Sequence, residues 1–179
     1  YMKKVRGQYI LEEYSDMVSS ITTMLDTFPE TEYKRDLYYH RARVRERTEE
    51  YTKACVDYTA ALKAKNTTGV LDDEEIRYRL GVCYYFSLEY KKARKQFEQL
   101  IETPYMQKMP IDVGLWLGDY VGSQGDYAQA INVYKKLLQR SGFVEARERV
   151  LYKVGTWLFE LNRWQEAATM FSALIEQFE

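Results

Sequence analysis

The residues of this chain that could carry out catalysis are few, and their spacing forms no recognisable catalytic arrangement. There is one histidine, His40, and there are two cysteines, Cys55 and Cys83, which lie 28 positions apart. A thiol or hydroxyl nucleophile needs a base beside it. The sequence also has no Gly-rich phosphate loop, no His–Glu pair at metal-binding spacing and no nucleophile elbow. We therefore predict a protein that is not an enzyme, with no catalytic residues, no metal site and no cofactor.

Each of these residues has a simpler structural interpretation. Cys55 and Cys83 lie within helical patterns at positions typical of small or aliphatic core residues, and two widely spaced cysteines indicate a reduced compartment. His40 could face a binding groove or the solvent. The acidic run at 72–75 resembles a metal-binding loop only loosely, and we expect it to favour the positive N-terminal end of the helix that follows.

The overall charge disfavours two large classes of partner. There are 26 lysine and arginine residues against 27 aspartate and glutamate residues, so a net charge of -1 gives no long-range field to attract nucleic acid or anionic lipid. No apolar run approaches the ~18 residues of a membrane-spanning helix. We expect a cytoplasmic protein without membrane insertion. Because the sequence starts at Tyr1 and stops at Glu179 within a helical pattern, we also expect a segment of a longer chain.

The spacing of apolar residues predicts an all-α chain with an internal repeat. Only three prolines occur in 179 residues, and apolar residues recur every three or four positions between them. Ala93, Ala130 and Ala167 are 37 residues apart, and an aromatic residue stands three positions before each of them, as it does before Ala54. Another aromatic residue follows four positions after each alanine and an aliphatic residue eight positions after it, which is one face of a helix.

A second small residue stands twelve positions before each alanine, within a preceding helical stretch. These residues are Ala42, Gly81, Gly118 and Gly155. A glycine inside a helix costs ~1 kcal/mol relative to alanine, so three glycines at one repeat position indicate a gain in packing. We predict two antiparallel helices in each repeat, which approach each other closely at this position.

The pattern resembles the tetratricopeptide repeat, whose consensus places Trp, Leu-Gly, Tyr, Ala, Phe, Ala and Pro at fixed offsets in two antiparallel helices. The residues that carry the resemblance are Leu80, Gly81, Tyr84, Tyr90, Ala93, Phe97 and Pro104, then Leu117, Gly118, Tyr127, Ala130 and Tyr134, and then Val154, Gly155, Trp164, Ala167 and Phe171. The resemblance implies an all-α, right-handed α-solenoid of antiparallel helical hairpins with about ten helices.

We expect residues 1–179 to form a single solenoid domain. Four repeats lie at about 35–68, 74–107, 111–144 and 148–179, residues 1–31 form a degenerate fifth, and the longest loop covers 63–73. In the first full repeat, Arg41 and Arg45 stand where the family has Leu and Tyr. The packing of this repeat against residues 1–31 should therefore differ from the packing in the family.

The resemblance also implies a function, that of a scaffold or adaptor that binds a peptide or a segment of a partner protein in a concave groove. The first helix of each repeat lines this groove. The family offsets assign to it Tyr39, Arg43, Tyr78, Arg79, Tyr85, Trp116, Tyr152 and Lys153. Aromatic and basic side chains of this kind are enriched at binding hot spots, and we expect a peptide with both an apolar anchor and a carboxylate. The family's clamp for chaperone tails requires asparagines that this chain lacks at the matching positions.

A second function stays open at this point. A solenoid needs polar outer faces on its terminal repeats, but the last repeat is rich in apolar residues and has no capping helix. These residues are Trp157, Leu158, Leu161, Phe171, Leu174 and Ile175. The chain could therefore associate with itself as a homo-oligomer, or serve as a structural segment of a larger complex, through its ends and its convex face.

Overall fold

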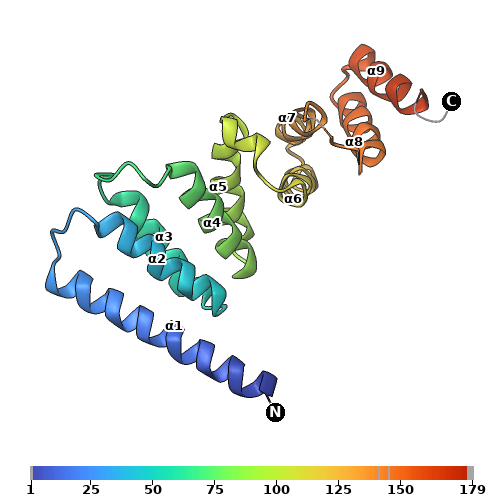
Figure 1. The fold of residues 1–179 in the computed structure, drawn as a ribbon. Helices are drawn as coiled ribbons and strands as arrows, with labels where there is room; N and C mark the ends of the chain where they lie inside the picture. Colours follow the sequence, from blue (N-terminus) through green and yellow to red (C-terminus); the bar gives the residue numbers. More distant parts are fainter. Residues whose placement is uncertain (1, 141, 145, 177–179) are drawn as a thin grey trace. The chain divides into compact units, whose positions relative to one another are not determined.

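The computed structural model describes residues 2–140, 142–144 and 146–176, with side chains from residue 13 onward. Within this range the chain forms nine α-helices and one short 3-10 helix, and no strand (Figure 1). The chain divides into two compact units, Tyr1–Leu100 and Ile101–Glu179. We call them the first and the second unit and describe each by itself.

The first unit consists of one long helix followed by two helical hairpins (Figure 1). Its helices are α1 (Met2–Thr27), α2 (Lys34–Arg47), α3 (Tyr51–Lys63), α4 (Asp73–Phe86) and α5 (Tyr90–Ile101). Helix α1 packs against α2, α2 against α3, and α3 against α4. The nine α-helices and the 3-10 helix of the described residues agree with the prediction of about ten helices. Residues 2–27, predicted as a degenerate repeat, form a single continuous helix.

The second unit contains the other two hairpins. Its elements are the 3-10 helix η1 (Pro104–Gln107) and the helices α6 (Ile111–Ser123), α7 (Tyr127–Leu138), α8 (Arg147–Glu160) and α9 (Trp164–Ile175). Helix α6 packs against α7, α7 against α8, and α8 against α9. The four hairpins of the two units fall in the ranges of the four predicted repeats, whose last positions, 177–179, lie outside the described residues. The single-domain prediction stays a prediction.

The close approach of the two helices of a repeat is confirmed, and the structure shows what fills the space. A Cβ atom built on each repeat glycine would collide with the aromatic ring that lies four positions after the repeat alanine. The distances to Cε1 of that ring are 2.5 Å for Gly81 and Phe97, 2.1 Å for Gly118 and Tyr134, and 2.6 Å for Gly155 and Phe171. Glycine at these three positions leaves room for the ring, which occupies the place that a side chain would take.

Each hairpin turns through a left-handed residue at the same repeat position. The φ angles are 61° at Glu49, 61° at Leu88, 80° at Gly125 and 58° at Asn162. In the turn at Leu88, the amide of the next residue donates to the carbonyl of Tyr84, as in a Schellman motif. Glycine adopts this conformation without strain, whereas leucine and glutamate do not.

The two unexpected arginines of the first repeat take part in a buried polar network. Asp57 on α3 is 1% exposed, and its carboxylate accepts hydrogen bonds from Arg41 at 2.7 and 3.0 Å and from Arg45 at 2.7 Å. Nη1 of Arg41 also donates to Oγ1 of Thr22 on α1 at 2.9 Å. Packing between α1 and α2 therefore includes a polar contact at this position.

Candidate functional site

The predicted binding residues all lie on the first helix of a hairpin, which we call the front helix. The front helices are α2 and α4 in the first unit and α6 and α8 in the second. Helix α2 carries Tyr39 and Arg43, α4 carries Tyr78, Arg79 and Tyr85, α6 carries Trp116, and α8 carries Tyr152 and Lys153. The first five residues belong to one compact unit and the last three to the other.

Arg79 in the first unit is already paired with carboxylates of its own chain. Its Nε lies 2.6 Å from Oε1 of Glu75, and its Nη1 lies 3.1 Å from Oε1 of Glu46 on the neighbouring front helix. The other oxygen of Glu46 accepts a hydrogen bond of 2.5 Å from the hydroxyl of Tyr58. The Arg79 guanidinium thus links α4 to the preceding hairpin.

The second unit repeats this arrangement with different residues. Lys153 pairs with Asp119 on α6, and the hydroxyl of Tyr134 donates to the same carboxylate. Lys153 and Arg79 both stand fourteen positions before their repeat alanine. In each unit, one carboxylate therefore joins a buried tyrosine of its own repeat to a cation of the next repeat.

The protonation of the two tyrosines supports this arrangement. Burial raises the pKa of Tyr58 far above its usual value, and the hydrogen bond to Glu46 raises it further. Burial and the contact with Asp119 raise the pKa of Tyr134 in the same way. Both phenols therefore remain protonated at neutral pH and donate to these side chains.

The predicted aromatic residues differ in how they are held. Tyr152 is 58% exposed and Tyr85 is 37% exposed. The ring of Tyr78 is partly covered and lies 6.3 Å from that of Phe97, whereas Trp116 stacks at 5.2 Å on Tyr120 of the same helix. Aromatic surface is thus available on front helices of both units.

A hollow of about 350 Å³ opens between α1 and α2 in the first unit, and we call it the α1–α2 hollow. Its lining includes two predicted residues, Tyr39 and Arg43. The full lining is Tyr14, Met17, Tyr39, His40, Arg43, Val44 and Arg47. Three of these residues are basic and none is acidic.

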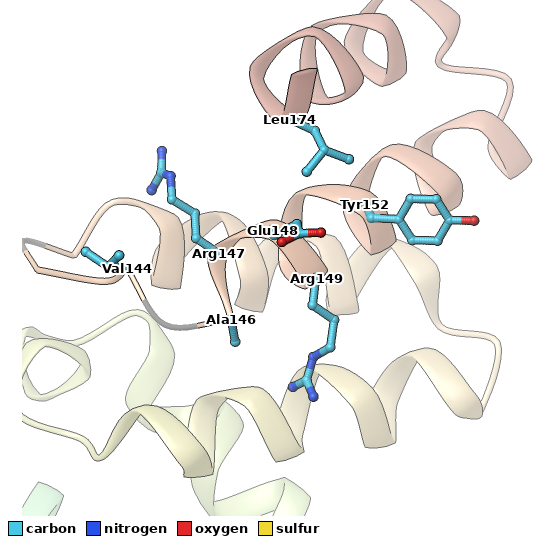
Figure 2. A pocket seen from close by; sticks show the side chains of 7 residues that line it. All are labelled: Val144, Ala146, Arg147, Glu148, Arg149, Tyr152 and Leu174. Atoms are coloured by element: carbon cyan, nitrogen blue, oxygen red, sulfur yellow. The ribbon is translucent and has the colours of Figure 1, made fainter. Parts of the chain in front are cut away.

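The second unit has a hollow of about 570 Å³ at the start of α8, shown in Figure 2, which we call the α8–α9 hollow. It is lined by Val144, Ala146, Arg147, Glu148, Arg149, Tyr152 and Leu174. Arg147 donates to the carbonyl of Leu138 at 3.3 Å, and Arg149 lies 3.6 Å from Asp119. In Figure 2 these two arginines extend in different directions on either side of Glu148. Both cations of this hollow are therefore engaged by their own chain.

Sequence reasoning missed the roles of Glu46 and Asp119 as internal partners, and the contribution of Tyr14 and Met17 to a hollow. A signal for the carboxylates is present in the sequence. Tyr58 and Tyr134, four positions after their repeat alanines, have a hydroxyl to donate to a carboxylate, whereas Phe97 and Phe171 at the same position have none. No comparable signal marks the α1 residues, because their place depends on how α1 packs.

Within the part of the chain that the structure describes, no three His, Cys, Asp or Glu side chains are grouped so as to hold a metal ion. The same part contains no helix both long and apolar enough to cross a membrane. Cys55 and Cys83 are free thiols, and both are buried, as predicted for core residues. His40 is exposed at the α1–α2 hollow.

Comparison with known proteins bears on the repeat. Residues 75–104 and 149–179 match the family model of the tetratricopeptide repeat. Two crystal structures of MamA are similar to this chain at 15% identity, with TM-scores of 0.56 and 0.57, covering 95% and 98% of this chain and 91% and 88% of theirs. The C-terminal part of a TPR repeat-containing protein from Cytophaga hutchinsonii is similar at 15% identity and a TM-score of 0.51, over 98% of this chain and 64% of that one.

A search of curated protein sequences finds no match. These matches confirm tetratricopeptide repeats at two of the four predicted positions and the predicted fold class, an all-α solenoid of helical hairpins. They also support the general function class predicted from the sequence, a protein-interaction scaffold.

Proposed function

We propose that this chain is a non-catalytic, cytoplasmic scaffold that binds a peptide or an extended segment of a partner protein on its front helices. The observation that carries the proposal is the α1–α2 hollow, because it lies at two of the residues that the repeat offsets assign to a binding groove, Tyr39 and Arg43. Aromatic and basic side chains surround it, and this composition is typical of binding hot spots.

The predicted binding residues have two different roles, because two of them form internal ion pairs and the aromatic ones do not. Arg79 and Lys153 hold adjacent repeats together, so their substitution would act on the scaffold as well as on a ligand. Aromatic residues supply contact surface within each unit, Tyr78 and Tyr85 in the first and Trp116 and Tyr152 in the second. Large flat rings bury much area at a small cost in side-chain entropy, which suits the recognition of a flexible segment.

Selection from a displayed library of short random peptides, with the whole chain as bait, tests this function. For a selected peptide, Tyr78→Ala and Trp116→Ala should each raise the Kd by about tenfold or more in calorimetry, because hot-spot rings dominate such interfaces. Lys95→Ala, an exposed change on the second helix of a hairpin, is the control and should leave the Kd unchanged. Failure to enrich any peptide, or a Kd that depends on Lys95 alone, would contradict the proposal.

A second candidate function is self-assembly, and the last hairpin favours it. Several large apolar side chains there are exposed, namely Phe159 at 53%, Leu161 at 38%, Trp164 at 52% and Ile175 at 61%. Surface of this kind is typical of an interface. Light scattering distinguishes the two functions, because a mass that doubles with concentration and falls on Trp164→Glu supports assembly, whereas a constant monomer mass supports the scaffold.

A further inference from the structure

The cations that the repeat offsets assign to a partner carboxylate are not equally available. In the first unit, Arg79 is shared between Glu46 and Glu75, and in the second unit, Lys153 is held by Asp119. An arriving carboxylate would have to displace an internal one at either position, so little would be gained. The basic side chains that can bind a carboxylate must therefore be sought elsewhere.

The α1–α2 hollow contains such side chains. Arg47 is exposed at its rim, and its guanidinium has no ion pair or hydrogen bond among the residues that the structure describes. The Nε of Arg43 reaches Glu46 only at 4.0 Å, and that carboxylate is already bonded to Tyr58 and Arg79. His40 adds an exposed imidazole on the same helix.

The spacing of the two arginines suits an extended chain. Arg43 and Arg47 are four residues apart on α2, which places them on the same face and about 6 Å apart along the helix axis. Alternate side chains of an extended segment are separated by about 6.6 Å and point the same way. Two acidic residues with one residue between them can therefore pair with the two arginines at once, whereas a single terminal carboxylate cannot.

Helix α1 provides the opposite, less polar wall of the hollow. Tyr14 and Met17 line it from α1, and Met17 is 47% exposed. The ring of Tyr39 on α2 also lines the hollow. A segment that carries an aliphatic residue between its acidic residues could cover this surface. Such a hollow, at about 350 Å³, is within the size range of sites that hold small ligands or side chains.

We propose that the α1–α2 hollow binds an extended acidic segment of a partner protein, with acidic residues at alternate positions held by Arg43 and Arg47 and aliphatic residues against Tyr14 and Met17. This inference rests on the proposed function and specifies the chemistry of its ligand. The α8–α9 hollow is not expected to bind this segment, because both of its arginines contact groups of their own chain.

The test uses three synthetic peptides and the whole chain. The first is a five-residue peptide of alternating glutamate and leucine, blocked at both ends. The second has glutamine in place of glutamate, and the third is this neutral peptide with a free C-terminal carboxylate. Binding is followed by nuclear magnetic resonance on the isotope-labelled chain. The blocked acidic peptide should bind at least about fivefold more tightly than the other two and shift the resonances of α1 and α2, because it alone neutralises both arginines.

Matched charge changes locate the site. Arg43→Gln and Arg47→Gln should each raise the Kd of the acidic peptide about fivefold or more, and added salt should reduce this difference. Arg149→Gln removes the same charge from the α8–α9 hollow and should have no effect. Equal loss with Arg149→Gln would overturn the inference by showing unspecific charge attraction.

The outcomes also separate this inference from the function on which it rests. If the neutral peptide binds the front helices as tightly as the acidic one, the inference fails while the scaffold function stands. If the free carboxylate of the third peptide restores full affinity, the hollow binds the C-terminal carboxylate of a peptide and the inference also fails. If neither these peptides nor any peptide from the displayed library binds, the inference and the scaffold function fail together.

Discussion

Two interfaces between successive repeats, one in each unit, occupy equivalent repeat positions but differ in the residues that fill them. One consists of large aromatic rings and the other of small and polar side chains. In the second unit, Trp157 of α8 inserts against the preceding hairpin, where its ring stacks at 6.0 Å on Tyr127 and at 5.5 Å on Tyr134. Gly122 makes this possible, since a Cβ there would lie 2.4 Å from Cζ2 of the indole. This interface is a stack of large aromatic rings.

The first unit has small and polar residues at the same repeat positions. Cys83 stands where the second unit has Trp157, and Glu46 stands where it has Gly122. Cys83 packs in a cluster with Cys55 and Tyr58, and Glu46 pairs with Arg79 across the interface. The comparison shows that a fixed backbone arrangement accepts either a large ring beside a glycine or a thiol beside a charged pair, provided that the volume is filled.

Removal of the buried charge of the first unit should have the largest effect on stability. Asp57→Ala leaves Arg41 and Arg45 without their common carboxylate in a buried place, so it should cost about 3–5 kcal/mol. Urea unfolding followed by circular dichroism measures this loss. Asp57→Asn retains one acceptor oxygen and should cost less. An Asp57→Ala variant with an unchanged midpoint would show that the network contributes nothing to the first unit.

Truncation of the aromatic stack comes next in size. Trp157→Ala removes the ring that fills the space beside Gly122 and should cost about 3 kcal/mol, because the cavity cannot collapse onto a glycine backbone. Trp164, which is 52% exposed, is the control, and Trp164→Ala should cost less than about 1 kcal/mol. The two losses are compared by chemical unfolding. A larger loss for Trp164 would place the main packing of α8 elsewhere.

The two carboxylates that join successive repeats allow a direct comparison of the units. Glu46→Gln and Asp119→Asn each remove a charge that faces a cation of the next repeat, and each should cost about 1 kcal/mol. The side chain of Glu46 is 18% exposed and that of Asp119 is 36% exposed, so salt should screen the pair of Asp119 more strongly. Unfolding at low and high salt checks this order, and equal salt sensitivity would contradict it.

Substitutions in the hairpin turns should have the smallest effect on stability, and the effect should have opposite signs in the two units. Leu88→Gly should stabilise the chain by up to about 1 kcal/mol, because leucine is strained at a φ of 61° and its side chain is 71% exposed. The equivalent residue of the second unit is Gly125, and Gly125→Ala should destabilise by about 1 kcal/mol. Melting temperatures of both variants measure the pair. Destabilisation by Leu88→Gly would show that the leucine side chain has a packing role.

Much of the fold could be predicted from the sequence because it depends on local pattern. The pairing of a glycine with an aromatic ring, such as Gly118 with Tyr134, recurs within each hairpin and reveals both its helices and their contact. The structure of residues 2–27 was harder to predict from the sequence. Their pattern fits the second helix of a repeat, but they form one long helix. Helical periodicity does not show where a helix begins when the sequence has no proline, glycine or capping residue to mark its start.

The sequence by itself determined which helix carries the candidate binding residues, since the repeat offsets place Tyr39, Arg43 and Arg79 on the first helix of their hairpins. Only the tertiary structure decided which of these side chains are available. Arg79 is neutralised by Glu46, which is 33 residues away, whereas among the described side chains no carboxylate approaches Arg43 closer than 4.0 Å. The physical reason is that a charge is neutralised by atoms near it in space, and besides Glu75 of the same helix these include Glu46 of the preceding repeat, whose approach depends on how the repeats pack.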